Sequence, residues 1–215
     1  MRKELRAKLS LGLCLLCAPK EKKGRIFMDK IVNKPKQIIS STKKLVGTAV
    51  FAALAYVVSM LEFPIFPATP FLKLDFSAVF LLLAGFIFGT IYGISACAVK
   101  ELICVITKSS TGGVGELANF LVIGAYILIP TLVYHYKKGI KVVILTLIVA
   151  CFVQVCLSLL VNRYINFPLY MGGGAKAFFQ SVWQFVALFN LIKSVAISVL
   201  TILLYKKLSA LIKSI

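Results

Sequence analysis

The chain has 215 residues, of which 60% are hydrophobic and 15% are charged. A soluble domain has about 45–50% apolar and about 25% charged residues, so this composition excludes an ordinary soluble domain and indicates an integral membrane protein. The apolar segments are long and continuous and do not alternate, which favours helices over a β-barrel. At about 20 residues per span, the length predicts an all-α protein with six transmembrane helices.

The net charge of +18 does not indicate nucleic-acid binding, because 13 of the 25 Lys and Arg residues lie within residues 1–44. Basic residues beside membrane spans mark the cytoplasmic side and contact anionic lipid. We therefore predict a basic cytoplasmic tail over residues 1–43 and a membrane domain over residues 44–215, with the lipid bilayer as a partner and no nucleic acid. Residues 1–27 are alternatively an over-extended start before Met28.

The cysteines do not predict a metal site. Cys14 and Cys17 form a C-x-x-C pair, but no second pair has matching spacing and His135 is the only histidine.

The first span is predicted at residues 44–61 and carries Ala49-x-x-x-Ala53, with Ala52 on the same side. Small residues at this spacing let another helix approach closely in lipid. That other helix belongs either to a partner protein or to the same bundle.

Residues 62–75 follow, with prolines at positions 64, 67 and 70. Proline lacks an amide donor and breaks helices, so we expect a stiff, extended loop. Its phenylalanines make it apolar enough to lie across the mouth of a cavity.

The next spans are predicted at residues 76–88 and, after a turn at 89–93, to residue 107. Lys100 and Glu101 fall in the middle of this second segment. Ionisable residues inside a membrane are costly and usually face the bundle interior or a wet cavity. Adjacent helical positions point about 100° apart, so we expect each side chain to have its own partner elsewhere.

The most polar stretch between apolar segments is K-S-S-T-G-G-V-G-E-L-A-N-F at residues 108–120. Its glycines let the backbone turn tightly and approach a ligand closely. We interpret it as a ligand-facing loop that runs into a helix; a plain interhelical turn is the alternative. The remaining spans are predicted at residues 116–136, 141–161 and 177–205, with a flexible, glycine-containing loop at 162–176.

The outer half of the last span is unusually polar. Asn190 and Lys193 are three residues apart and share one helical face, and Trp183 lies two turns back along that face. A buried amide and a buried ammonium need partners, which a polar ligand could supply.

Lysines at 43/44, 137/138/141 and 206/207/213 fall on one side of a six-span bundle. That side, with both termini, is predicted to be cytoplasmic. The proline-containing loop, the loop at 108–120, the loop at 162–176 and the polar half of the last span then converge on one external mouth.

Three motifs resemble a known family: K-L-D-F-S at 73–77, S-T-G-G-V-G-E-L-A-N-F at 110–120 and N-L-I-K at 190–193. They resemble the substrate-binding (S) subunits of energy-coupling-factor (ECF) vitamin transporters, and most of all the riboflavin-specific members. The resemblance implies a multi-pass protein of the bacterial plasma membrane that binds its vitamin extracellularly under a lid made by the first loop. It also implies a transmembrane coupling subunit and two cytoplasmic ATPase subunits as partners.

The resemblance also implies roles for individual residues. It places Asn190 and Lys193 against the flavin, and Ala49 and Ala53 against the coupling subunit. The chemistry fits, because Asn190 can donate to and accept from the uracil-like edge of riboflavin and Lys193 can donate to a carbonyl. The expected substrate-binding set is completed by Glu116, Asn119 and Thr111 for the ribityl hydroxyls and by Leu74 and Trp183.

Riboflavin is thus the expected transported substrate, with FMN or another vitamin as the alternative, and no cofactor is expected. The chain lacks G-x-x-x-x-G-K-[ST], so the energy must come from partner subunits. A small intramembrane enzyme using Lys100, Glu101 and Glu116 is a second hypothesis, but no catalytic motif accompanies these residues. A structural or channel-forming protein would not explain polar residues gathered at one end of the bundle.

Overall fold

A computed structural model of the chain describes residues 41–212 apart from 68, 70, 110 and 111, with side chains to residue 205. Residues 1–40, with Cys14 and Cys17, lie outside the described residues, as does the predicted site residue Thr111. The compact unit to which the following description refers begins at residue 39.

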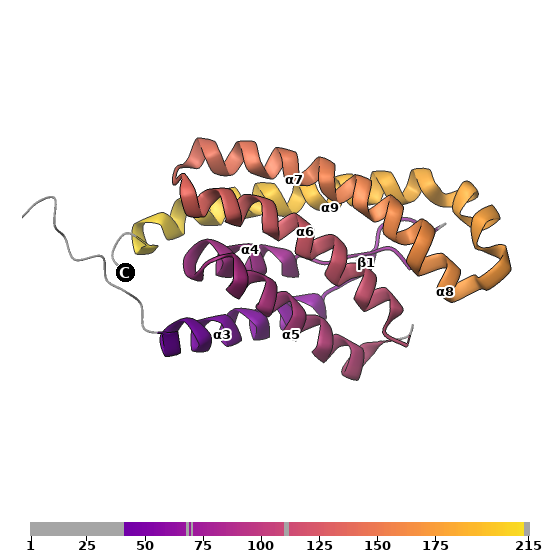
Figure 1. Cartoon of the computed structure of the whole chain (residues 1–215), viewed down its shortest axis with the longest axis horizontal. Helices are drawn as coiled ribbons and strands as arrows, with labels where there is room; N and C mark the ends of the chain where they lie inside the picture. The colour runs from indigo at the N-terminus through magenta and orange to yellow at the C-terminus, as the bar shows by residue number, and fades with distance from the viewer. Residues whose placement is uncertain (1–40, 68, 70, 110–111, 213–215) are drawn as a thin grey trace, which may run out of the picture. The chain divides into compact units, whose positions relative to one another are not determined.

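This unit is built from helices, which confirms the predicted all-α class (Figure 1). The long apolar segments form six helices within the described residues: α3 (Ser41–Ser59), α4 (Ser77–Phe88), α5 (Thr90–Lys108), α6 (Val114–Tyr136), α7 (Ile140–Val161) and α9 (Ala175–Ile212). Four helical stretches in this part of the chain are long and apolar enough to cross a membrane: α3, α5, α6 and the joined stretch from residue 140 to 205. Within that stretch α7 and α9 run side by side in opposite directions (Figure 1).

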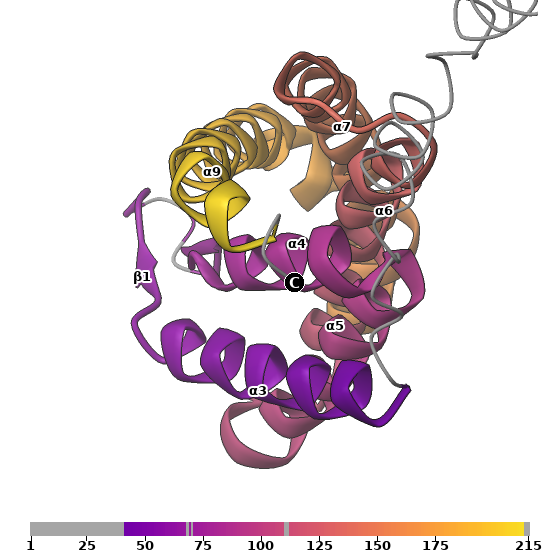
Figure 2. The ribbon, with the colours of Figure 1, turned by 90° about the vertical axis from the view of Figure 1, so that its left-hand side faces the viewer.

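Helix α4 occupies the centre of the bundle and packs against α3, α5, α6 and α9 (Figure 2). Nine of its 12 residues are buried, as expected for a helix that is apolar all round. It is about 18 Å long at 1.5 Å per residue, too short to span a hydrocarbon core of about 30 Å.

The link between α4 and α5 depends on glycine. Gly89 has a φ of +116°, which favours a residue without a β-carbon. One turn away on each side, Gly85 and Gly93 let the two helices touch, since a β-carbon on Gly93 would lie 2.9 Å from the Cα atom of Gly85.

The predicted extended loop after α3 is a short hairpin. Strands β1 (Phe63–Pro64) and β2 (Lys73–Leu74) pair antiparallel, with Phe63 opposite Leu74. Leu72 and Leu74 are buried in a cluster with α8 and α9 that includes Phe167, Phe179 and Phe189. The apolar side of the hairpin is therefore fastened to the last helix.

The prediction of a flexible loop at residues 162–176 is wrong. The chain stays helical through η1 (Asn162–Asn166, a π-helical turn), α8 (Phe167–Met171) and η2 (Gly172–Gly174). Pro168 sits in the first turn of α8, where its missing N–H breaks no hydrogen bond. The chain turns at Gly172, whose φ is +56°.

Ala49 and Ala53 on α3 are exposed on the outside of the bundle. The expectation that Ala52 shares their side is wrong, because Ala52 is buried inside the bundle with Ala55. No helix of the described residues therefore covers the alanine pair.

Candidate functional site

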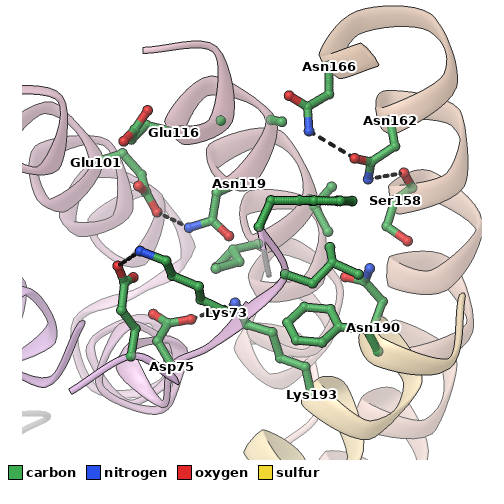
Figure 3. A pocket seen from close by; sticks show the side chains of 18 of the residues that line it. Lys73, Asp75, Glu101, Glu116, Asn119, Ser158, Asn162, Asn166, Asn190 and Lys193 are labelled. Carbon is green, nitrogen blue, oxygen red and sulfur yellow. Dashed lines mark hydrogen bonds and ion pairs between the residues drawn. The ribbon is translucent and has the colours of Figure 1, made fainter. Parts of the chain in front are cut away.

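A cavity of about 260 Å³ lies at the end of the bundle where the hairpin, the end of α5 and the start of α6 meet. Its lining comes from the hairpin segment, α5, α6, α7, η1, α8 and α9. Figure 3 shows polar side chains from opposite walls pointing into it. The predicted convergence of the first loop, the loop before α6 and the last helix on one mouth is confirmed, although the three glycines at 172–174 do not line the cavity.

One wall carries four buried charges, Asp75, Lys100, Glu101 and Lys193, which we call the buried quartet. The Lys193 Nζ atom lies 2.5 Å from Asp75 Oδ1, and the Lys100 Nζ atom lies 3.8 Å from Asp75 Oδ2. Lys100 also donates to Glu101 Oε1 at 2.9 Å. None of the four exposes more than 7% of its side chain. With two carboxylates and two ammonium groups, the quartet is neutral overall.

Asp75 lies in the link between β2 and α4 and is the centre of this wall. Burial alone would raise the pKa of its carboxyl, but Lys193, Lys100 and the hydroxyl donor of Ser77 hold the pKa well below its usual range. Asp75 is therefore a carboxylate at neutral pH, and Lys193 faces a fixed negative charge.

The expectation that Lys100 and Glu101 do not pair with each other is wrong. Their backbone positions diverge, but both side chains are long and flexible enough to meet, and burial of two opposite charges favours the contact. The expectation of separate partners is confirmed as well. Lys100 reaches Asp75, and Glu101 accepts a hydrogen bond of 2.5 Å from Asn119 Nδ2.

The opposite wall is a polar ladder on α7 and η1, formed by residues at four-residue spacing: Gln154, Ser158, Asn162 and Asn166. Asn162 donates to the carbonyl oxygen of Ser158 at 2.8 Å, and Asn166 donates to Asn162 Oδ1 at 2.9 Å. Figure 3 shows Ser158, Asn162 and Asn166 facing the cavity.

Gln154, the deepest rung, is only 1% exposed, and its Oε1 atom has no hydrogen-bond partner among the described residues. An unsatisfied buried acceptor costs about 1–3 kcal/mol. A ligand N–H or O–H group reaching this oxygen would remove that cost.

The mouth of the cavity is crossed by ion pairs. Glu62 accepts from Lys108 at 2.8 Å and from Lys73 at 3.0 Å, and Lys108 also donates to the carbonyl oxygen of Ser59 at 2.8 Å. Partial burial would raise the pKa of Glu62, but the two lysines lower it below its usual value. The apolar side chains of Phe71 and Leu72 line the cavity beside them.

Four of the predicted substrate-binding residues line this cavity: Asn190, Lys193, Glu116 and Asn119. Asn190 donates from Nδ2 to the carbonyl oxygen of Val186 at 2.9 Å, and Glu116 accepts from Ser109 Oγ at 3.0 Å. Asn119 hydrogen-bonds Glu101, so two predicted contacts, Asn119 and Lys193, are held by the quartet.

Two other predicted residues lie away from the lining. Leu74 is buried in the apolar cluster that holds the hairpin against α9. Trp183 is 44% exposed and borders a separate surface hollow between η1 and α9, beside Arg163. Among the described residues, no group of three or more His, Cys, Asp or Glu side chains gathers as metal ligands.

Sequence reasoning missed Asp75 and the polar ladder as site residues. The ladder had a readable signal, because four polar residues at four-residue spacing fall on one face of an apolar helix. Asp75 lies in the K-L-D-F-S motif but had no such spacing signal, since its partner Lys193 is 118 positions away in the chain.

A helical bundle with a polar, charge-balanced cavity at one end is the architecture of a membrane-embedded binding protein. Residues 43–205 match the family described as "ECF transporter, substrate-specific component". The chain belongs to this family. It is thus a multi-pass membrane protein that binds a substrate, without being an enzyme, and works with the other subunits of an ECF transporter.

Named relatives extend this similarity. The chain is 33% identical to "Riboflavin transporter RibU" of Staphylococcus aureus (strain TCH60) over 182 residues, covering 82% of this chain and 96% of the relative. It is 31% identical to "Riboflavin transporter FmnP" of Bacillus subtilis (strain 168), covering 77% and 92%. A solved structure described as "Structure and mechanism of the S component of a bacterial ECF transporter" superposes with a TM-score of 0.70 at 35% identity, covering 80% of this chain and 98% of the other.

Proposed function

We propose that this protein captures riboflavin at the outer face of the cell membrane and delivers it inward together with a transmembrane coupling subunit and two cytoplasmic ATPase subunits. Similarity to two transporters named for riboflavin, over more than nine-tenths of their length, supports this substrate. The observation that carries the proposal is the cavity itself, in which the unpartnered Gln154 acceptor faces a wall of donors and carboxylates.

The lining suits a flat molecule with a polar edge and a hydroxyl-rich tail. Asn190 and Lys193 lie together on α9, and we assign them the uracil-like edge of the ring, which alternates acceptors with a donor. Glu116, Asn119 and the polar ladder are assigned to the ribityl hydroxyls. Phe71, Leu72 and Phe189 supply apolar surface for the ring faces.

The charges favour a neutral substrate. The cavity is lined by four lysines (Lys73, Lys100, Lys108 and Lys193) and four acids (Glu62, Asp75, Glu101 and Glu116). A phosphate group would bring about −1.5 to −2 charges into this balanced set. We therefore assign riboflavin as the preferred substrate and FMN as the weaker one.

The size of the cavity assigns a role to the hairpin. Pockets for ligands of this kind measure roughly 300–1,000 Å³, and the cavity of about 260 Å³ falls below that range with Phe71 and Leu72 of the hairpin segment inside its lining. We therefore assign this hairpin segment, residues 62–75, as the lid, which moves outward when riboflavin enters. Leu74 acts by packing the lid onto α9.

We assign six passes through the membrane, one for each of the six helices, with the extended segment before the short α4 completing its pass, and with the basic tail and both termini in the cytoplasm. Lys43 and Lys44 at the start of α3 and Lys137, Lys138 and Lys141 at the turn from α6 to α7 support this orientation, because they lie at the end opposite the cavity (Figure 1). Ala49 and Ala53 are assigned to the contact with the coupling subunit, which their exposed position on α3 supports.

The test is the absorbance spectrum and riboflavin titration of the detergent-purified protein. We expect a yellow protein with a visible flavin band, or a colourless one that quenches the fluorescence of added riboflavin with saturation. FMN in the same titration should compete less well. A colourless protein that leaves riboflavin fluorescence unchanged would contradict the flavin assignment and leave another vitamin as the substrate.

A further inference from the structure

The quartet links two proposed ligand contacts that lie on different helices. From α6, Asn119 donates to Glu101; Glu101 is paired with Lys100; Lys100 faces Asp75; and Asp75 is paired with Lys193 on α9. Lys100 is the middle member of this chain of contacts and the only one that touches both carboxylates.

Among the described residues, Asp75 and Glu101 are the carboxylates paired with the Lys100 ammonium. The titratable and charged groups that face it are Asp75 from the β2–α4 link, Lys193 from α9, and Glu101, Cys97 and Cys104 from its own helix. From α6, the uncharged amide of Asn119 contacts Glu101, and Glu116 lines the same cavity. Without the ammonium of Lys100, two buried carboxylates would face the single ammonium of Lys193.

Such an imbalance would act on the ligand contacts. Lys193 would be shared between two carboxylates, and Glu101 would lose the cation that fixes its Oε1 atom as the acceptor for Asn119. An uncompensated buried charge is strongly unfavourable, so the site would either rearrange or take up a proton.

We infer that Lys100 is a positioning residue of the ligand site: by balancing Asp75 and Glu101 it holds Lys193 on α9 and Asn119 on α6 in place. The inference rests on the proposed function, because the effect is measured on a bound ligand. Lys100 and Glu101 then serve the site by holding other side chains in place, without touching the ligand themselves and without any catalytic role.

The experiment compares four proteins by riboflavin fluorescence quenching between pH 5.5 and 8.5: the wild type, Lys100→Met, Glu101→Gln and the double variant Lys100→Met/Glu101→Gln. Melting temperatures of the ligand-free proteins are recorded over the same range. The double variant is the matched control, because it removes one charge of each sign while the amide oxygen of Gln still accepts from Asn119.

We expect wild-type affinity to be constant over this range. Lys100→Met should bind about tenfold more weakly at pH 8.5 and recover toward pH 5.5, because a proton on one carboxyl replaces the lost charge. Glu101→Gln leaves two ammonium groups against one carboxylate. Its affinity for riboflavin should therefore have the opposite pH dependence: weakest at pH 5.5 and recovering toward pH 8.5. The double variant should bind within about threefold of the wild type at every pH.

A pH-independent loss in Lys100→Met that persists in the double variant would overturn the inference, since Lys100 would then act by touching the ligand. Unchanged binding in Lys100→Met would overturn it as well. If Lys100→Met does not fold, two measurements still test the inference. These are the pH dependence of riboflavin affinity in Glu101→Gln and the return to near wild-type affinity in the double variant. Failure of the wild type to bind riboflavin contradicts the proposed function instead, and the melting temperatures then show separately whether charge balance holds the quartet.

Discussion

Lys108 at the end of α5 lies 2.8 Å from Glu62 at the start of the hairpin. The same ammonium donates to the main-chain carbonyl of Ser59 at 2.8 Å, and Lys73 on β2 joins Glu62 from the other side. One lysine therefore ties α3, α5 and the proposed lid together at the mouth of the cavity. We call this set of contacts the latch.

Replacing Glu62 with Gln should loosen the latch without changing side-chain volume. Partly exposed ion pairs contribute up to about 1 kcal/mol, so we expect riboflavin to dissociate about three- to fivefold faster. Stopped-flow recovery of flavin fluorescence measures this rate. Lys73→Gln is the matched control: it removes only the contact on the exposed side and should have a smaller effect. Equal rates for Glu62→Gln and wild type would show that the latch does not hold the lid.

The latch should be insensitive to pH under ordinary conditions. The pKa of Glu62 in the folded protein is lower than its usual value of 4.5. A group with a lowered pKa stabilises the fold above its unfolded pKa and loses that contribution as the pH falls through the folded pKa. The dissociation rate of riboflavin should therefore be constant from pH 8 to 5 and rise only below about 4.5. A rise between pH 7 and 5 would mean that another group controls the lid.

Asn190→Ala tests the edge contact. Removing the amide would leave polar groups of the ligand without partners, so riboflavin binding should weaken by roughly 1–3 kcal/mol. Isothermal titration or fluorescence quenching gives the affinity. Asn190 Nδ2 also bonds its own helix at Val186, so the melting temperature of the ligand-free variant serves as the control. Unchanged affinity would remove Asn190 from the site.

Gln154→Leu should separate stability from binding. The Oε1 atom of Gln154 is buried and has no hydrogen-bond partner in the described part of the chain, so a side chain of similar size without polar atoms should leave the ligand-free protein as stable as the wild type or more stable. Riboflavin affinity should nevertheless fall by about 1–3 kcal/mol, because a ligand donor loses its acceptor. Thermal unfolding with and without riboflavin measures both effects. Full affinity in this variant would show that the ligand does not reach the deepest rung.

Ala49→Trp tests the partner surface. A large side chain on the exposed face of α3 should spare riboflavin binding but block uptake in cells that contain the whole transporter. Leu145→Trp on α7 is the control, because Leu145 is exposed on a helix far from α3 across the bundle (Figure 2). Uptake that survives in Ala49→Trp would show that the coupling subunit docks elsewhere.

The helices could be predicted from the sequence because length and hydrophobicity are local properties. The ends of α3, α6 and α7 fall within a few residues of the predicted bounds. The cavity end was also predictable, since Asn190 and Lys193 lie on an otherwise apolar helix and must face something polar.

Other features depend on contacts that no local pattern encodes. The pairing of Lys100 with Glu101 depends on side-chain conformations and on Asp75, which arrives from a distant segment. Residues 162–176 contain Pro168 and three glycines, which locally favour a loop, yet packing of Phe167 against α9 accompanies a helical path. Tertiary packing overrode local preference in both places.

The short length of α4 has a consequence for how the protein makes room for its substrate. A full-length central helix would fill the outer part of the bundle, whereas α4 begins only at Ser77, is about 18 Å long and is preceded by the extended segment that carries Asp75. The room for a ligand thus comes from the shortness of the central helix, and the surrounding helices do not have to move apart. Because Asp75 stands only two residues before α4, the proposed lid, the buried wall at Asp75 and the central helix are one continuous piece of backbone, so outward movement of the lid would act directly on the centre of the bundle.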